Sequence, residues 1–337
     1  MDFLQPVGTP REVVAALASW LSAPEEPAAL VVETSGSTGA PKRVLLSRRA
    51  VLASVDASAR RLGDTGPWLL ALPPSYIAGV QVVCRSLSAG HEPLLLDETG
   101  SVAGGVAAGA RFLSLVPTQL HRLLDDAAEA EALAALHTVL LGGGPIDPAL
   151  RARAEAAGVH VVATYGSAET AGGCVYDGYP LDGVALVIGA DGRIRIGGPT
   201  LFDGYDGDQA ATAGALVDGW FLTSDAGRLD DDGRLHVLGR LDDVVVTGGV
   251  NVPGPAVAAR LRQHPAVTAA EVVGVPDEEW GNRLVAFVVG DLALDEARAW
   301  VGEAHPRSWA PRQVVVVEAL PFLANGKVDR LRLKDLA

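Results

Sequence analysis

The chain has 337 residues, of which 49% are hydrophobic and 20% are charged, a balance typical of globular proteins. This length exceeds the size at which one hydrophobic core usually stops growing, so we expect two domains. The formal net charge of −14 argues against a general nucleic-acid binder, whose basic surface displaces counterions from phosphates. A nucleotide ligand stays open, because a few backbone N–H groups, one lysine and one metal ion can hold phosphates on an acidic protein.

Cysteine usage and the apolar runs indicate the compartment. Cys84 and Cys174 lie far apart and in no metal-ligand spacing, which favours a reducing compartment over a disulfide framework. No basic stretch followed by an apolar one opens the sequence, so no signal peptide is visible. Glycine, proline and charge interrupt every apolar run before it reaches the length of a membrane span. We therefore expect a cytoplasmic protein with no membrane insertion and no nucleic-acid partner.

Short aliphatic runs alternate with alanine-rich helical stretches over the first half of the chain. A Gly-Gly-Gly-Pro turn at 142–145 follows one such run, and Asp147-Pro148 then forms an N-cap and first-turn pair for a helix that ends at Gly158. The rhythm predicts helices at 47–62 and 117–136 between strands at 29–33, 68–72, 112–116, 138–141 and 159–163. Such strand–helix–strand units predict an α/β core with mainly parallel strands.

The pattern changes at about Gly183, where short strand-like runs are separated by turn signals such as Asp191-Gly192. These runs predict a small antiparallel β region within the large N-terminal domain. After residue 241 an α+β pattern follows, with helices at 255–264 and 295–304 and strands at 270–275, 284–289 and 313–317. We therefore expect a large domain at 1–240 and a small α+β domain at 241–337.

The segment 34–42, Thr-Ser-Gly-Ser-Thr-Gly-Ala-Pro-Lys, directly follows a predicted strand. Glycines let the backbone approach an anion closely, while hydroxyls and N–H groups point at it. The segment is not a Walker A loop, because Pro41 replaces the glycine before the lysine. A structural Ser/Gly loop is the alternative. The phosphate-binding interpretation rests on Thr34, Ser35, Gly36, Ser37, Thr38, Gly39 and Lys42.

This loop resembles the phosphate-binding signature of the adenylate-forming enzymes, which include acyl-CoA synthetases, luciferases and peptide-synthetase adenylation domains. Residues 165–170, Tyr-Gly-Ser-Ala-Glu-Thr, resemble the Y-G-x-x-E-T segment of the same family. The resemblance implies that Tyr165 and Gly166 border the adenine, that Ser167 contacts a phosphate, and that Glu169 holds Mg²⁺. A carboxylate suits a hard cation that bridges phosphates. Taken alone, Tyr-Gly-Ser is a common structural loop.

Two further segments resemble the ribose-binding and hinge segments of that family. Residues 219–227 resemble G-W-x-x-T-G-D-x-G, with Ser224 where the family usually has glycine. The resemblance implies that Asp225 accepts hydrogen bonds from both ribose hydroxyls, a role that suits an acceptor-only carboxylate. From residues 239–243 it implies that Arg240 also reaches the ribose and that Asp242 is the pivot of a mobile C-terminal domain. Without the resemblance, an Arg–Asp pair beside a turn is an ordinary surface ion pair.

Residues 321–330 resemble the P-x-x-x-x-G-K-x-x-R segment, whose lysine enters the active site during adenylation. Read alone, a lysine near a C-terminus is a solvated side chain. The segments together occur in the order found in the family, and this co-occurrence carries the resemblance. It implies catalytic roles for Lys327, Glu169 and Thr38, and it implies ATP, Mg²⁺ and coenzyme A as cofactor and co-substrates.

The acyl pocket is expected around residues 72–79, where Tyr76 holds the place of a His or aromatic ring at the pocket mouth. The turn 142–145 resembles the glycine turn that flanks adenine and acyl group, which assigns Gly143 and Gly144 to the nucleotide. Only 33 residues precede Thr34, fewer than the usual first subdomain. In this the chain resembles the short o-succinylbenzoate–CoA ligases of menaquinone biosynthesis. For this aromatic keto-dicarboxylate we expect substrate contacts from Tyr76, Arg85, Ser114, Thr118 and Gly142.

Three alternatives stay open. The chain could be a CoA ligase for another aryl or medium-chain acid. It could be a stand-alone peptide-synthetase adenylation domain, although no Asp that recognises an amine is evident. It could also be a non-catalytic adenylate-binding remnant, against which the retention of Glu169, Asp225, Arg240 and Lys327 speaks. The short N-terminal region further suggests an apolar face for a partner subunit and thus a homodimer.

Overall fold

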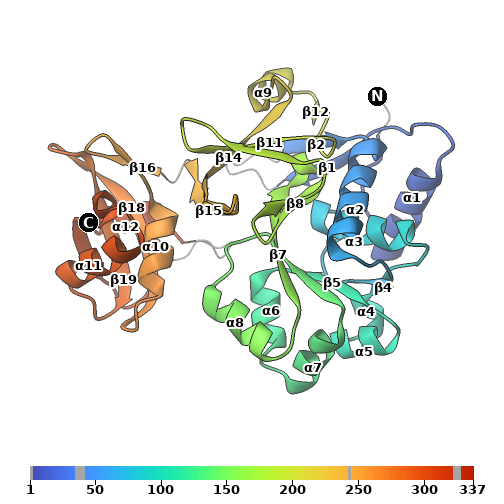
Figure 1. The fold of residues 1–337 in the computed structure, drawn as a ribbon, viewed down its shortest axis with the longest axis horizontal. Helices are drawn as coiled ribbons and strands as arrows, with labels where there is room; N and C mark the ends of the chain where they lie inside the picture. Colours follow the sequence, from blue (N-terminus) through green and yellow to red (C-terminus); the bar gives the residue numbers. More distant parts are fainter. Residues whose placement is uncertain (1–2, 35–41, 242–243, 322–327) are drawn as a thin grey trace. The chain divides into compact units, whose positions relative to one another are not determined.

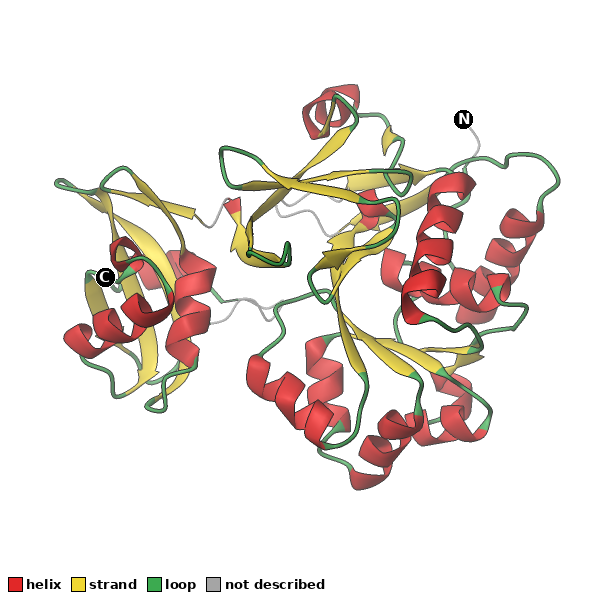
Figure 2. Ribbon diagram, in the orientation of Figure 1, coloured by secondary structure: helices red, strands yellow, loops and turns green. Residues whose placement is uncertain are grey.

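The computed structural model describes residues 3–34, 42–241, 244–321 and 328–337 (Figures 1 and 2). The chain divides into two compact units. The first comprises residues up to Val187 together with 195–222 and 231–234, and the second comprises 188–194, 223–230 and the residues from Leu235 onward. Strands β10 (Ala185–Ile188), β11 (Arg193–Gly197) and β14 (Trp220–Leu229) contribute residues to both units. A single boundary at residue 241 therefore stays a prediction.

A seven-stranded sheet forms the centre of the first unit, in the order β4-β3-β5-β6-β7-β8-β9. The five strands β4, β3, β5, β6 and β7 run parallel to one another. Strand β8 pairs antiparallel with β7, and β9 pairs antiparallel with β8. Every residue of β5 and β6 is buried, as expected for parallel strands whose two faces are both covered. The strands are β3 (Trp68–Leu70), β4 (Leu94–Leu95), β5 (Phe112–Leu115), β6 (Thr138–Leu141), β7 (Val161–Ser167), β8 (Gly172–Tyr176) and β9 (Tyr179–Pro180).

Helices follow the strands of this sheet and cover it (Figure 2). A buried cluster joins β5 and β6 to the helices on one face through Leu113, Leu141, Leu120, Leu133 and Leu150. The predicted α/β class is thereby confirmed. The helices are α1 (Pro10–Ser22), α2 (Arg48–Leu62), α3 (Ile77–Ser88), α4 (Leu96–Thr99), α5 (Val102–Ala107), α6 (Pro117–Leu123), α7 (Ala127–Ala135) and α8 (Pro148–Ala156).

The single helix predicted at 117–136 is wrong, because the structure has two helices there, α6 and α7. The break has a local cause. The carboxylate of Asp126 accepts hydrogen bonds from the backbone N–H groups of Ala128 and Glu129 at 2.8 and 3.1 Å. An aspartate in this position starts a new helix rather than continuing the old one. Asp147 caps α8 in the same way, as the sequence predicts.

The strand predicted at 29–33 lies outside the parallel sheet. It is β1 (Leu30–Thr34), which pairs antiparallel with β2 (Lys42–Leu46) in a separate three-stranded sheet. The third strand, β12 (Gly204–Tyr205), pairs with β2 on its other edge. Only residues 35–41 separate β1 from β2, and a parallel pair would need a crossover of about a dozen residues or more. An antiparallel hairpin is therefore the arrangement that this spacing allows.

The predicted antiparallel β region occupies residues 185–240. In it, β13 (Leu216–Val217) pairs with the first residues of β14, and β15 (Leu235–Arg240) pairs with the last residues of β14. The helix α9 (Gln209–Ala215) precedes β13. A 3-10 turn, η1 (Ala168–Thr170), joins β7 to β8.

The second unit contains an α+β core. In it, β18 (Val267–Asp277) pairs antiparallel with β19 (Gly281–Gly290), which pairs parallel with β20 (Gln313–Val316). Helix α10 (Gly254–Arg262) buries Val257 and Leu261 in the same cluster as Val272 of β18. The remaining elements are β16 (Val244–Thr247), β17 (Val250–Pro253), α11 (Leu294–Ala304), η3 (Arg307–Trp309) and α12 (Arg330–Asp335).

Within the described ranges, every helix is too short or too polar to cross a lipid bilayer.

Candidate active site

Several predicted site residues follow the carboxyl ends of neighbouring parallel strands. Ser114 lies near the end of β5, the glycine turn 142–144 follows β6, and residues 165–167 end β7. The N–H of Gly142 donates to the carbonyl of Leu115 at 3.1 Å, which ties the glycine turn to the end of β5. In open α/β sheets, ligands bind in the crevice outside these strand ends. The structure thus brings the predicted adenine and acyl segments to one edge of the sheet.

Two glycines at this edge have no room for a side chain. A Cβ on Gly142 would lie 2.3 Å from Oγ1 of Thr164, and a Cβ on Gly166 would lie 2.1 Å from the carbonyl oxygen of Gly172. Both distances are far below a van der Waals contact, so any larger residue would displace a strand end. The two glycines therefore have a structural reason to be present, whether or not they also contact a ligand.

Ser167 has an unpaired hydroxyl. Its backbone N–H donates to Oγ1 of Thr170 at 2.9 Å, and Thr170 in turn donates to the carbonyl of Gly172 at 2.7 Å. These bonds fix the turn, yet Oγ of Ser167 is buried and has no hydrogen-bond partner among the described residues. An unsatisfied buried hydroxyl costs about 1–3 kcal/mol. It therefore suits a group that a ligand satisfies.

Glu169 and Lys42 both contact the side chain of Tyr205. The hydroxyl of Tyr205 donates to Oε1 of Glu169 at 2.9 Å, and Nζ of Lys42 lies 4.7 Å from the centroid of the same ring. Burial, followed by the charge of Glu169, raises the pKa of Tyr205, so the phenol remains a donor. No motif points to this tyrosine, because a Gly-Tyr pair carries no signal by itself.

Glu169 fits the role of a cation ligand. Glu169 is only 9% exposed, and its carboxylate forms no ion pair with the described lysines, arginines or histidines. A buried carboxylate without a neutralising side chain is costly unless it is paired or binds a metal. Carboxylate oxygens are the ligands that Mg²⁺ prefers. The donor chemistry around Glu169 is therefore compatible with a magnesium ion.

The structure describes only the flanks of the predicted phosphate loop. Thr34 and Lys42 stand opposite each other in the β1–β2 register, and Oγ1 of Thr34 donates to the carbonyl of Lys42 at 3.4 Å. The other predicted loop residues, the predicted hinge and the predicted catalytic lysine lie outside the described residues. Their roles stay predictions: Ser35, Gly36, Ser37, Thr38, Gly39, Asp242 and Lys327.

The predicted ribose pair lies within the second unit. Asp225 of β14 stands directly opposite Arg240 of β15 in the antiparallel register. The backbone N–H of Asp225 donates to Oγ1 of Thr223 at 3.1 Å, which fixes the start of this paired stretch. Opposite charges on cross-strand positions attract each other. Two residues that the sequence only ordered along the chain are thus neighbours in space.

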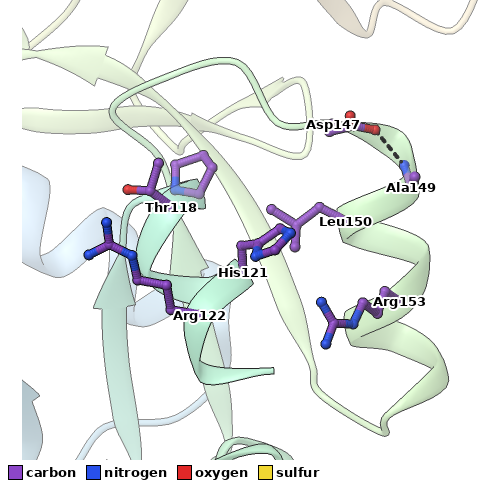
Figure 3. A pocket seen from close by; sticks show the side chains of 8 residues that line it. Thr118, His121, Arg122, Asp147, Ala149, Leu150 and Arg153 are labelled. Atoms are coloured by element: carbon purple, nitrogen blue, oxygen red, sulfur yellow. Dashed lines mark hydrogen bonds between the residues drawn. The ribbon is translucent and has the colours of Figure 1, made fainter. Parts of the chain in front are cut away.

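The predicted acyl residues fall into two groups. Thr118 lines an open pocket of about 490 Å³ between α6 and α8, together with His121, Arg122 and Arg153 (Figure 3). Figure 3 shows Asp147, another lining residue, at the start of α8, where its carboxylate accepts a hydrogen bond from the N–H of Ala149. Ser114 is buried, whereas Tyr76 at the start of α3 is 52% exposed.

Arg85 lines a different cavity, of about 290 Å³, whose wall also contains Ser58, Trp68, Asp56 and Asp64. The Arg85 residue is 8% exposed, its Nη2 donates to the hydroxyl of Tyr176 at 3.2 Å, and its Nε has no partner among the described residues. Arg85 makes no ion pair with the described carboxylates. The structure therefore does not bring Arg85 and Thr118 to the same pocket.

Neither cysteine is a candidate nucleophile. Cys84 and Cys174 are free and fully buried. Burial raises the pKa of each thiol to about 12, because the charged form loses its hydration. The reactive thiolate is therefore absent at neutral pH.

Comparison with known proteins identifies the family of the chain. The family model described as AMP-binding enzyme matches residues 12–206, and the model described as AMP-binding enzyme C-terminal domain matches residues 256–327. The chain belongs to the AMP-binding enzyme family. The predicted resemblance to adenylate-forming enzymes is confirmed.

Two similar proteins are ligases. The chain is 45% identical over 324 residues to a probable 2-succinylbenzoate–CoA ligase of Mycobacterium tuberculosis, covering 92% of this chain and 84% of that protein. It is 33% identical over 331 residues to the 2-succinylbenzoate–CoA ligase of Listeria monocytogenes, covering 91% and 70%.

The solved structures give the same picture. The o-succinylbenzoate CoA synthetase of Bacillus subtilis, in complex with the acyl-adenylate intermediate, is similar with a TM-score of 0.77 at 29% identity, covering 91% of this chain and 69% of that one. An AMP complex of that enzyme is similar at the same TM-score with 28% identity.

Proposed function

We propose that this chain is an ATP-dependent CoA ligase, which activates o-succinylbenzoate as an acyl-adenylate and transfers the acyl group to coenzyme A. The proposal rests on one observation: Glu169 accepts a hydrogen bond from the hydroxyl of Tyr205, and the ammonium of Lys42 lies over the ring of the same residue. A metal-binding carboxylate and a phosphate-binding ammonium are thereby held near each other, as an Mg²⁺-bound triphosphate requires. The names of the relatives support o-succinylbenzoate as the acid and coenzyme A as the thiol.

In the first half-reaction, an oxygen of the substrate carboxylate attacks the α-phosphorus of ATP. The new O–P bond forms as the bond to pyrophosphate breaks, so negative charge grows on the phosphate oxygens. No protein nucleophile is needed, and catalysis consists of positioning and electrostatic stabilisation. Bound at Glu169, Mg²⁺ would supply part of the positive field. Lys42, Lys327 and the loop at 34–42 supply the rest, and Asp225 and Arg240 bind the ribose.

In the second half-reaction, the thiol of coenzyme A attacks the acyl carbonyl. The C–S bond forms, AMP leaves with the carboxylate oxygen that it gained, and the thiol proton passes to solvent. Since Lys327 serves only the adenylation step, we propose that the C-terminal segment rotates about Asp242 before this step. A hinge residue of this kind absorbs a large change in φ and ψ.

We propose that Arg85 takes the second carboxylate of o-succinylbenzoate. Only one of the two carboxylates of this acid reacts with ATP, so the other needs a binding partner. Arg85 is a buried cation with an unpaired Nε, and such a group is costly without a counter-charge. A planar guanidinium matches a carboxylate with two parallel hydrogen bonds. Ser114, Tyr76 and Gly142 remain proposed contacts for the rest of the acid, whereas Thr118 lines a different pocket and its role stays a prediction.

ATP–pyrophosphate exchange with a panel of carboxylic acids tests the substrate assignment. The proposal predicts that o-succinylbenzoate gives the highest kcat/KM. A preference for benzoate or for a medium-chain acid would favour the broader CoA ligase, and exchange that depends on an amino acid would favour an adenylation domain. AMP binding without exchange for any acid would indicate a non-catalytic remnant. A homodimer stays a prediction, which sedimentation equilibrium can check.

A further inference from the structure

A buried tyrosine joins the two segments that we assign to ATP. Tyr205 lies in β12 and is 7% exposed. Its hydroxyl donates to Oε1 of Glu169, and the ammonium of Lys42 lies over one face of its ring. Glu169 and Lys42 are far apart in the sequence, so this tyrosine is the observed link between them.

The backbone of Tyr205 is held firmly. Tyr205 stands opposite Val44 in the pairing of β12 with β2, and its N–H donates to Oγ1 of Thr212 at 2.8 Å. Its ring packs against Phe202 with centroids 4.9 Å apart. A residue fixed at the backbone and packed at the ring has little freedom to move its hydroxyl.

The same segment also holds the backbone of Glu169. The N–H of Phe202 donates to the main-chain carbonyl of Glu169 at 2.9 Å. Residues 202–205 therefore donate two hydrogen bonds to Glu169, one to its main-chain carbonyl and one to its side-chain carboxylate. Two anchors fix both the position of the residue and the rotation of its carboxylate.

The hydrogen bond from Tyr205 makes the two carboxylate oxygens of Glu169 different from each other. A carboxylate only accepts hydrogen bonds, so the phenol must donate, and it occupies a lone pair of Oε1. The other oxygen, Oε2, is left for a cation. Outer partners that orient a ligating carboxylate typically change metal affinity or activity by about 10–100-fold when they are removed.

We propose that Tyr205 is a positioning residue for adenylation, which orients Glu169 toward the metal ion of MgATP and holds Lys42 beside it. The inference rests on the proposed function for the identity of the nucleotide step, but the metal-binding effect can be measured without turnover. Tyr205 does not touch the reacting atoms in this account. It acts through Glu169 and Lys42.

The variant Tyr205→Phe isolates the hydroxyl, because the ring that contacts Lys42 and Phe202 remains. We expect Mn²⁺ affinity, measured by electron paramagnetic resonance in the presence of a non-hydrolysable ATP analogue, to fall about 10–100-fold. The Mg²⁺ concentration for half-maximal ATP–pyrophosphate exchange should rise by a similar factor. Thioester formation from supplied acyl-adenylate and coenzyme A should stay unchanged, since this step uses no metal-bound triphosphate.

Two controls separate positioning from a general structural role. Tyr179→Phe removes the same hydroxyl from a 42% exposed tyrosine and should change none of these quantities. In a Glu169→Gln background, adding Tyr205→Phe should cause little further loss of metal affinity, because residues that act as a unit are not additive.

Unchanged Mn²⁺ affinity in a folded Tyr205→Phe variant would overturn the proposal, as would fully additive losses in the double variant. Equal loss in both half-reactions would show that the tyrosine supports the fold rather than Glu169. If the unaltered protein shows no exchange with any acid, the proposed function fails. The Mn²⁺ measurement still decides the role of Tyr205 in that case.

Discussion

Replacing Arg85 with methionine tests whether the buried guanidinium selects a dicarboxylate. The change keeps an unbranched side chain of similar reach and removes only the charged head. If Arg85 binds the second carboxylate of o-succinylbenzoate, a charge-assisted hydrogen bond worth about 1.5–3 kcal/mol is lost. At about 1.4 kcal/mol per tenfold change, kcat/KM for this acid should fall about 10- to 150-fold. An analogue that lacks the second carboxylate should be used equally well by both forms.

Stability should not suffer from the same change. Arg85 has no ion-pair partner among the described carboxylates, and the hydroxyl of Tyr176 keeps a hydrogen bond to Oγ of Ser58 at 2.8 Å. The change also removes the contact of Arg85 Cζ with the Trp68 ring, whose centroid lies 5.2 Å away. Burying a charge that has no ion-pair partner is costly, so its removal should offset this loss and Tm should remain the same or rise.

Two measurements on Arg85→Met decide the matter: pyrophosphate exchange with both acids and calorimetric unfolding. Arg60→Met serves as the matched control, because Arg60 is exposed and pairs with Asp182 at the surface. An equal fall in kcat/KM for both acids, or a marked fall in Tm, would refute the assignment and make Arg85 a structural residue.

Three further predictions concern Lys327, Asp242 and the two buried thiols. Lys327→Ala should lower adenylation about 10²–10³-fold, by analogy with the loss of one oxyanion contact; stopped-flow assays of each half-reaction check this, and an equal effect on thioester formation from supplied adenylate would contradict it. Asp242→Pro should instead spare pyrophosphate release and block thioester formation, because proline fixes φ; retained thioester formation in a coupled thiol assay would argue against the hinge. Folding stability should fall as pH rises from about 9 toward 12, since both folded thiols stay protonated while the unfolded chain ionises its own, at about 1.4 kcal/mol per thiol for each pH unit. Urea unfolding at pH 8 and pH 10 measures this slope, and Cys84→Ala should flatten it; identical slopes for the two forms would exclude the thiol as its source.

The sequence predicts the parallel core well because local signals and the global fold agree there. The strand at 138–141 matches β6, and Asp147 caps α8, since an aliphatic run, a glycine turn and an N-cap each act over a few residues. The prediction of one helix at 117–136 is wrong because two local signals disagree there. The alanine-rich composition of this stretch favours one helix, but the Asp126 side chain competes for backbone N–H groups and ends that pattern.

The candidate site is predicted from motifs only in part. Motif order indicates Glu169, Asp225 and Arg240, and the β14–β15 register places the last two opposite each other. Tyr205 was missed because its role depends on the pairing of β12 with β2, a contact between segments far apart in the sequence. The resemblance indicates Arg85 as a substrate residue, but the separation of Arg85 from the pocket of Thr118 depends on side-chain packing that no periodicity encodes.

Isotope transfer tests the proposed adenylation most directly. The protein would be incubated with ATP, Mg²⁺, coenzyme A and o-succinylbenzoate whose carboxylates carry ¹⁸O, and the products analysed by mass spectrometry. We predict o-succinylbenzoyl-CoA, pyrophosphate, and AMP that carries a single ¹⁸O atom from the acid. ADP with labelled phosphate, or thioester formation that leaves AMP unlabelled, would contradict an acyl-adenylate intermediate.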